Sequence, residues 1–169
     1  MIDVIQTSLR CSQLLWTLLC TALISSVIAD SFAGNPSCIN FAIFVCVLSW
    51  ITCIGGMIGA FNDKCLVPMV ILVLDTTTAF LSLISGIVLA AKLQVHSCED
   101  IRYILSNSLT NGSFNPSKRC HELQAATAFM WFLFISFMGS LYFDIVNGTK
   151  RSIAGSSGSR ASAPTMSQA

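Results

Sequence analysis

Four long apolar runs constrain this chain more than any other feature of its sequence. The runs occupy residues 13–29, 39–61, 66–91 and 123–146. A helix needs about 17–25 apolar residues to cross a hydrocarbon core that is about 30 Å thick. Within lipid, the backbone polar groups of each segment must bond to one another, which excludes irregular structure and open sheets. We therefore expect an all-α membrane protein, a bundle of four transmembrane helices.

The composition agrees with this class and argues against others. Hydrophobic residues make up 54% of the 169-residue chain and charged residues only 10%, whereas about a quarter of the residues in soluble proteins are charged. The net charge of +1 provides no global field that would attract nucleic acid. The sequence shows no Gly-rich phosphate loop, no nucleophile elbow and no pair of acids at one depth. We expect no enzyme activity, no cofactor and no metal.

The segments outside the runs divide the chain into three parts. These are a cytoplasmic head, residues 1–12; the four-span domain, residues 13–147; and a disordered cytoplasmic tail rich in Gly, Ser and Ala, residues 148–169. Four spans place both termini on one side of the membrane. The positive-inside rule favours the cytoplasm for that side, because Lys150 and Arg151 adjoin the last span.

The first run has a second interpretation. It could be the apolar core of a cleavable secretory signal, preceded by Arg10 and ending at Ala29. The length of the run and the acid Asp3 before it favour a retained span instead.

An acid lies inside the third run, where Asp75 is followed by three threonines. On a helical wheel of 100° per residue, one face collects small and polar residues, namely Asp75, Thr78, Ser82 and Gly86. We expect this face to point into the bundle, because a charge near mid-membrane costs about 2.5–3.5 kcal/mol. A proton or cation pathway needs a partner, and no second acid, Lys, Arg or His shares this depth. Bonding between helices is therefore the favoured role, and we expect Asp144, near the end of the fourth run, to be interfacial.

Small residues also repeat along the second run. Gly56 and Gly59 share a helical face with Ser49 and Thr52, and Gly55 and Gly59 form a small-xxx-small pair. Such residues let helix backbones approach closely in lipid, where burial of apolar surface alone does not drive association. We expect the three glycines to lie at helix contacts.

Two cysteines bracket the single long loop, residues 92–122. If this loop lies outside the cytosol, a disulfide between Cys98 and Cys120 is favoured. The alternative is a zinc site that adds His96 and His121, although the spacing is unlike that of common zinc-binding motifs.

The same loop carries a glycosylation sequon at Asn111. Its acceptor would be used if the loop faces the lumen or the cell exterior. The second sequon, at Asn147, would be cytoplasmic, and we expect it to remain unmodified.

Several segments from residue 66 onward resemble those of a known protein family. The segments are LVLDTTTAFLSLISGIVLA, VHSC ending at Cys98, KRC ending at Cys120, and QAATAFMWF. They resemble the fungal non-classical export protein family, which consists of four-span MARVEL-domain proteins. The final PTMSQA is also similar to the family terminus, whereas the first third resembles the family only in hydropathy and in LISS.

The resemblance implies a plasma-membrane protein with cytoplasmic ends that gathers in furrow-like domains organised by eisosomes. It implies a response to sphingolipids, an influence on cortical kinases and a role in unconventional secretion. The implied partners are sphingolipid, sterol, eisosome proteins and further copies of the chain. Asp75, Cys98 and Cys120 occupy motif positions, and the family offers no catalytic residues to transfer. Two other functions remain open: a small transporter or channel that uses Asp75, and a cargo adaptor of the secretory pathway.

Overall fold

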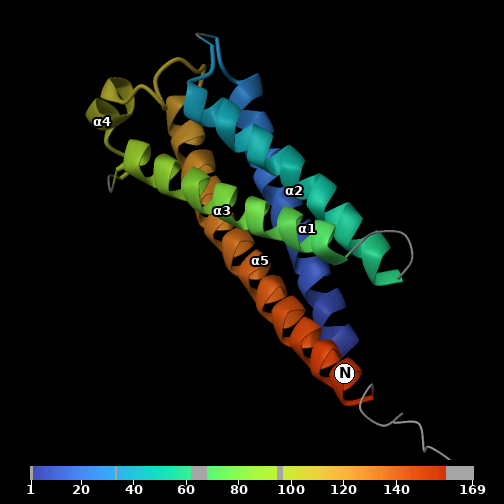
Figure 1. Ribbon diagram of the computed structural model, residues 1–169. Helices are drawn as coiled ribbons and strands as arrows, with labels where there is room; N and C mark the ends of the chain where they lie inside the picture. Colours follow the sequence, from blue (N-terminus) through green and yellow to red (C-terminus); the bar gives the residue numbers. More distant parts are fainter. Residues whose placement is uncertain (1, 33, 62–67, 95–96, 159–169) are drawn as a thin grey trace, which may run out of the picture.

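The protein is a bundle of four long helices with a short fifth helix at one end (Figure 1). The computed structural model describes residues 2–32, 34–61, 68–94 and 97–158. The helices are α1 (Ile2–Ala29), α2 (Ser37–Phe61), α3 (Pro68–Leu93), α4 (Ile101–Ser106) and α5 (Pro116–Gly158). The all-α, four-helix class expected from the apolar runs is confirmed.

Proline marks the start of three of these helices. Pro68 and Pro116 are the first residues of α3 and α5, and Pro36 directly precedes α2. Proline suits such positions because its fixed φ matches a helix and because a first-turn N–H would have no helical partner. The stretch after Pro116 contains no further proline until residue 164, so α5 continues uninterrupted to Gly158.

Each long helix contains a segment that is long and apolar enough to cross a membrane. These segments are Val4–Ala29, Ser37–Gly59, Met69–Leu93 and Pro116–Val146. Large apolar side chains cover the outside of all four helices; examples are Leu15 and Leu18 on α1, Val47 and Ile51 on α2, Phe80 and Ile87 on α3, and Phe132 and Ile135 on α5. Such a surface is typical of helices that face lipid.

The four long helices form a ring. α1 packs against α2 and α5, and α3 packs against the same two helices, so α1 and α3 lie on a diagonal of the bundle. The beginning of α1 and the end of α5 lie at one end, here called the terminal end (Figure 1). The opposite end, called the loop end, carries α4 and the segment that joins α3 to α5.

Two boundaries differ from those expected. α1 begins at Ile2 and so includes residues 2–12 of the expected head, in which Arg10 is buried inside the bundle and Ser8 is exposed. Residues 148–158 of the expected disordered tail are the last turns of α5, and this stretch contains no proline that would end the helix. Residues 159–169 lie outside the described residues.

The segment expected as a long loop, residues 92–122, is shorter in the structure, because α3 ends at Leu93 and α5 begins at Pro116. It contains α4, whose first turn is capped by the Asp100 side chain, which accepts hydrogen bonds from the backbone N–H groups of Arg102 and Tyr103. A carboxylate at the N-cap position bonds to backbone N–H groups of the first turn that would otherwise have no partner within the helix.

Candidate functional site

An ion pair crosses the interior of the bundle along its α1–α3 diagonal. Arg10 of α1 donates from Nη1 to Oδ1 of Asp75 at 2.7 Å and from Nη2 to Oδ2 at 2.5 Å. The two side chains are 3% and 0% exposed. Two parallel bonds between a guanidinium and a carboxylate fix both distance and orientation. The pair therefore joins α1 and α3, the two helices that face each other across the diagonal of the bundle.

A glycine of α2 makes room for this guanidinium. A Cβ atom at Gly56 would lie 2.7 Å from Cζ of Arg10 and 2.8 Å from its Nε. Any side chain at this position would displace the charged group. Gly56 therefore contributes to the site because its lack of a side chain leaves room for the guanidinium.

Gln13 extends the network from α1 to α5. Its side-chain oxygen accepts from Arg10 Nη1 at 3.1 Å. Its amide nitrogen donates to the Ser136 carbonyl at 3.1 Å and to the Ser140 hydroxyl at 2.7 Å. Because these side chains are buried, the bonds replace those that water would otherwise provide.

Asp144 of α5 is a second acid beside Arg10. Its Oδ2 lies 3.8 Å from Nη2 of Arg10, and its Oδ1 accepts from Nε2 of Gln6 at 2.9 Å. The Asp144 side chain is 30% exposed, so it is half-buried at the terminal end and contacts the buried pair. We call Gln6, Arg10, Gln13, Asp75 and Asp144 the intramembrane polar cluster; its formal charge is −1.

The partner of Asp75 is the residue that sequence reasoning missed. Arg10 was assigned to a head outside the first span, and the expectation that no cation shares the depth of Asp75 is therefore wrong. Asp75 lies about 9 Å along the axis from the first residue of its membrane segment, Met69, at about 1.5 Å per residue. That segment ends at Leu93 and its midpoint is Leu81, so Asp75 lies halfway between the terminal end of the segment and its middle, six residues from each. The spacing of Gln6, Arg10, Gln13 and Thr17 by four, three and four residues was the available signal.

The remaining polar residues of the α3 face also lie inside. Thr78 and Thr52 of α2 form a hydroxyl–hydroxyl bond of 2.8 Å, and Ser82 donates to the Ala79 carbonyl at 2.9 Å. Gly86 faces Trp131 of α5, where an added Cβ would make an ordinary contact at 3.5 Å.

Thr76 and Thr77, by contrast, are on the outside of α3. Each hydroxyl bonds back to a carbonyl one turn earlier, at 2.7 Å and 2.8 Å. Thr76 therefore does not join Asp75 in an interior path.

The glycines of α2 play different parts. Gly59 faces Ile71 of α3, whereas no described atom lies within 4 Å of a Cβ added at Gly55. Gly55 and Gly59 are about one turn apart, but only Gly59 meets a side chain of another helix, so the pair is not a shared contact face; the buried glycine of this stretch is Gly56.

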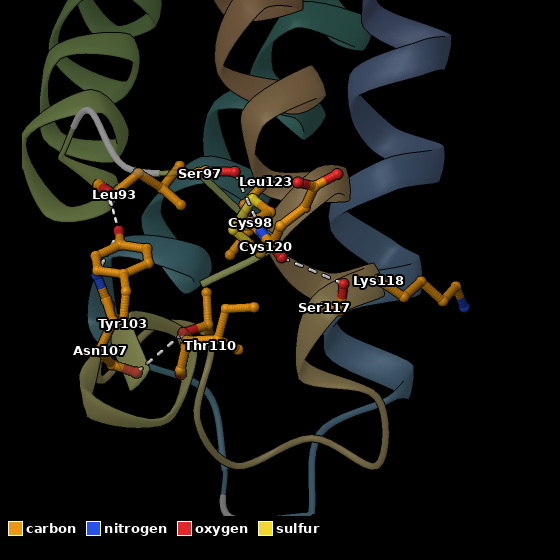
Figure 2. The surroundings of a disulfide bond; sticks show 12 residues. Leu93, Ser97, Cys98, Tyr103, Asn107, Thr110, Ser117, Lys118, Cys120 and Leu123 are labelled. Carbon is orange, nitrogen blue, oxygen red and sulfur yellow. Dashed lines mark hydrogen bonds between the residues drawn. A yellow bond between two sulfur atoms is a disulfide. The ribbon is translucent and has the colours of Figure 1, made fainter. Parts of the chain in front are cut away.

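A disulfide closes the loop end (Figure 2). It joins Cys98 to Cys120, with Cα atoms 5.7 Å apart, and packs with Tyr103 and Ile104 of α4. Sulfurs bonded to each other offer no thiolate to zinc, so the alternative metal site lacks two of its four ligands; His96 lies outside the described residues. Within the described part of the chain, no three His, Cys, Asp or Glu side chains are grouped closely enough to hold a metal ion.

Asn111 is exposed at the same end. Its Nδ2 donates to the Leu105 carbonyl at 2.9 Å, and Ser113 of the sequon is buried. The Asn147 side chain lies outside the described residues.

Residues 3–143 match MARVEL, the membrane-associating domain. The chain belongs to the MARVEL family. The match begins near the start of α1, so the first helix is part of the domain, which argues against its removal as a secretory signal.

Curated relatives of this MARVEL protein come from yeasts. Non-classical export protein 2 of Saccharomyces cerevisiae is 29% identical over 140 residues, which cover 82% of this chain and 79% of that protein. Its homolog 1 from the same organism is 32% identical over 65% of this chain and 62% of its own length. The homolog from Schizosaccharomyces pombe is 30% identical over 73% of this chain and 67% of its own. No solved structure matches the chain. The resemblance inferred from the sequence is confirmed.

Proposed function

We propose that this MARVEL protein is a non-enzymatic organiser of plasma-membrane domains, of the furrow-like kind associated with eisosomes. The observation that carries the proposal is the division of the bundle into a bonded interior and an apolar exterior. Inside, Arg10 and Asp75 are joined by two hydrogen bonds. Outside, large apolar side chains are exposed on all four long helices. A bundle built in this way acts on its surroundings through its lipid-facing surface.

The lengths of the membrane segments support a preference for thick membrane. They contain 23 to 31 residues, which corresponds to roughly 35–46 Å at about 1.5 Å per residue. Sterol- and sphingolipid-rich plasma membrane has a core of about 32–33 Å, against about 27 Å for the endoplasmic reticulum. Segments of this length tilt less in the thicker membrane, so we propose sphingolipid and sterol as the lipid partners.

The proposal places both termini in the cytoplasm. The two ends of the bundle differ in chemistry, since the disulfide lies at the loop end and disulfides persist in oxidising compartments. The terminal end would then face eisosome proteins and cortical kinases. The relatives are named for non-classical export, and we propose that an influence on unconventional secretion follows from domain organisation.

Two other functions compete with this proposal. A transporter or channel would use Asp75. This acid has the charged partner that such a path requires, Arg10, but two hydrogen bonds hold the two side chains together. A cargo adaptor would instead reside at steady state in secretory compartments.

Imaging tests the proposal. A fluorescently tagged protein should show a patchy distribution in the plasma membrane, and inhibition of sphingolipid synthesis should redistribute the patches. A smooth rim that ignores sphingolipid depletion would contradict the proposal, and retention in internal compartments would favour the adaptor.

A charge-free variant separates the organiser from the transporter. In Arg10→Gln/Asp75→Asn, both charges are removed together and the lipid-facing surface is unchanged. An organiser should keep its patches in this variant. A transporter should show ion flux after reconstitution of the wild type, and this flux should vanish in the variant.

A further inference from the structure

The short helix α4 presents three different faces. Tyr103 and Ile104 are buried against the disulfide. Ile101 and Leu105, four residues apart and therefore on one side of the helix, are 72% and 55% exposed. Arg102 is exposed beside them. One face is thus packed, and the next is apolar without a partner in the described structure.

Hydrogen bonds fix α4 to the end of α3 (Figure 2). The Tyr103 hydroxyl donates to the carbonyl of Leu93, the last residue of α3. Asn107, which follows α4 directly, donates from Nδ2 to the Lys92 carbonyl at 2.9 Å. These bonds satisfy carbonyls that a helix end otherwise leaves open. Since Leu93 also ends the membrane segment of α3, α4 lies where that segment leaves the hydrocarbon.

The disulfide holds α4 from the other side. Cys98 precedes α4 by three residues and is joined to Cys120 in the first turns of α5. A helix of six residues is too short to be stable alone in water, so it is these attachments that maintain it. They also prevent α4 from turning its apolar face elsewhere.

We propose that α4 is an interfacial helix that inserts Ile101 and Leu105 into the lipid leaflet on the loop side. The apolar outer surface of α3 continues to this level, because Ile87 is 50% exposed and Ala90 and Ala91, just before the end of the helix, are also exposed. Two cations at this level are exposed: Arg102, which follows Ile101 in α4, and Lys92, whose carbonyl accepts the hydrogen bond from Asn107. Cations that flank an apolar face match the phosphate groups above the acyl chains. The occupant of this face is therefore the bilayer itself.

Insertion of α4 would anchor the loop end. The covalent and hydrogen-bonded links make α3, α4 and the start of α5 one unit, so the depth of α4 sets the height at which α3 ends. This inference is independent of the proposed function, since any four-span bundle with this loop would be anchored in the same way.

Tryptophan placed on α4 tests the inference. Ile101→Trp and Leu105→Trp are compared with Ser108→Trp, a matched change at an exposed polar position just beyond the helix. Each variant is reconstituted in phosphatidylcholine nanodiscs, and the emission of the parent, from Trp16, Trp50 and Trp131, is subtracted. Quenching is measured with lipids brominated near the headgroup end of the acyl chains and with aqueous iodide. An intact disulfide, seen as a mobility difference between reduced and non-reduced samples, shows that each variant has kept the loop end.

The expected result is at least twofold stronger quenching by brominated lipid at positions 101 and 105 than at 108. Iodide should show the reverse order. Equal iodide quenching at all three positions, or no quenching of the added emission by brominated lipid, would overturn the inference.

Discussion

Arg10 and Asp75 stabilise the bundle as a pair and would each be costly alone. Both side chains are almost fully buried in segments that cross the membrane. Removal of one partner from a buried ion pair typically costs 3–5 kcal/mol, because the other charge stays behind unpaired. The two partners are not equivalent, since a carboxylate can become neutral by taking up a proton whereas a guanidinium stays charged.

This asymmetry gives a prediction for the pair. Asp75→Asn should lower the free energy of unfolding by about 3 kcal/mol, the lower end of this range, because Asp144 remains 3.8 Å from the guanidinium. Arg10→Gln should lower it by less, because Asp75 can then protonate. The double variant should recover part of the loss. Thermal unfolding in a mild detergent measures all three. Equal stability of Asp75→Asn and wild type would show that the ion pair contributes little.

Two neighbouring glycines of α2 provide a matched comparison. Gly56→Ala brings a methyl group onto the Arg10 guanidinium, so we expect the overpacking cost of about 1–3 kcal/mol. Gly55→Ala meets no described atom within 4 Å and should be neutral, or stabilising by up to about 1 kcal/mol through helix propensity. The same unfolding assay checks both, and the opposite order would contradict the packing around Arg10.

At the scale of elements, the loop end depends on a covalent link. The disulfide joins residues separated by 22 positions, and α4 packs directly on it. Without the bond, α4 would be held by its hydrogen bonds to the end of α3 and by its packing against α5. The polar cluster lies toward the other end of the bundle and shares no residue with this contact.

We therefore predict a local effect from removal of the disulfide. Cys98→Ser/Cys120→Ser should lose about 3 kcal/mol in the chain-entropy description of a loop of this size. Hydrogen exchange in residues 97–115 should accelerate, while that of the α1 segment around Gln13 changes little. Exchange that rises equally in both regions would show that the loop end is not a separate unit.

At the scale of the whole molecule, the start of the first helix and the end of the last helix lie at the same end of the bundle, the terminal end (Figure 1). Asn111 lies in the segment between α4 and α5, which belongs to the loop end. If the membrane is crossed four times, tags at the two termini must share a compartment that Asn111 does not reach.

Glycosidase treatment and protease protection together test this topology. In sealed membrane vesicles, N- and C-terminal tags should be cleaved or protected together. A mobility shift on glycosidase treatment should be abolished by Asn111→Gln and kept in Asn147→Gln. Tags with opposite protection, or a shift that depends on Asn147, would contradict the arrangement.

Much of the architecture follows from the chain alone, because the bilayer restricts what an apolar run can be. A run as long as residues 39–61 has only the helix available to it in lipid. The inward face of α2 follows in the same way, since the spacing of Ser49, Thr52 and Gly56 is that of one helical face. Asp75 was expected inside for the same reason.

Only the tertiary structure decided which side chain Asp75 meets. Arg10 lies 65 positions away in the sequence, and no local pattern links a residue near the start of α1 to one on α3. The pairing depends on the relative heights of two helices across a diagonal, which in turn depend on how both pack against α2 and α5. The position of α4 is similar, since six residues form a helix there only because α3 and the disulfide hold it. Helix formation in lipid is set by local backbone chemistry, whereas height and pairing are set by contacts between distant segments.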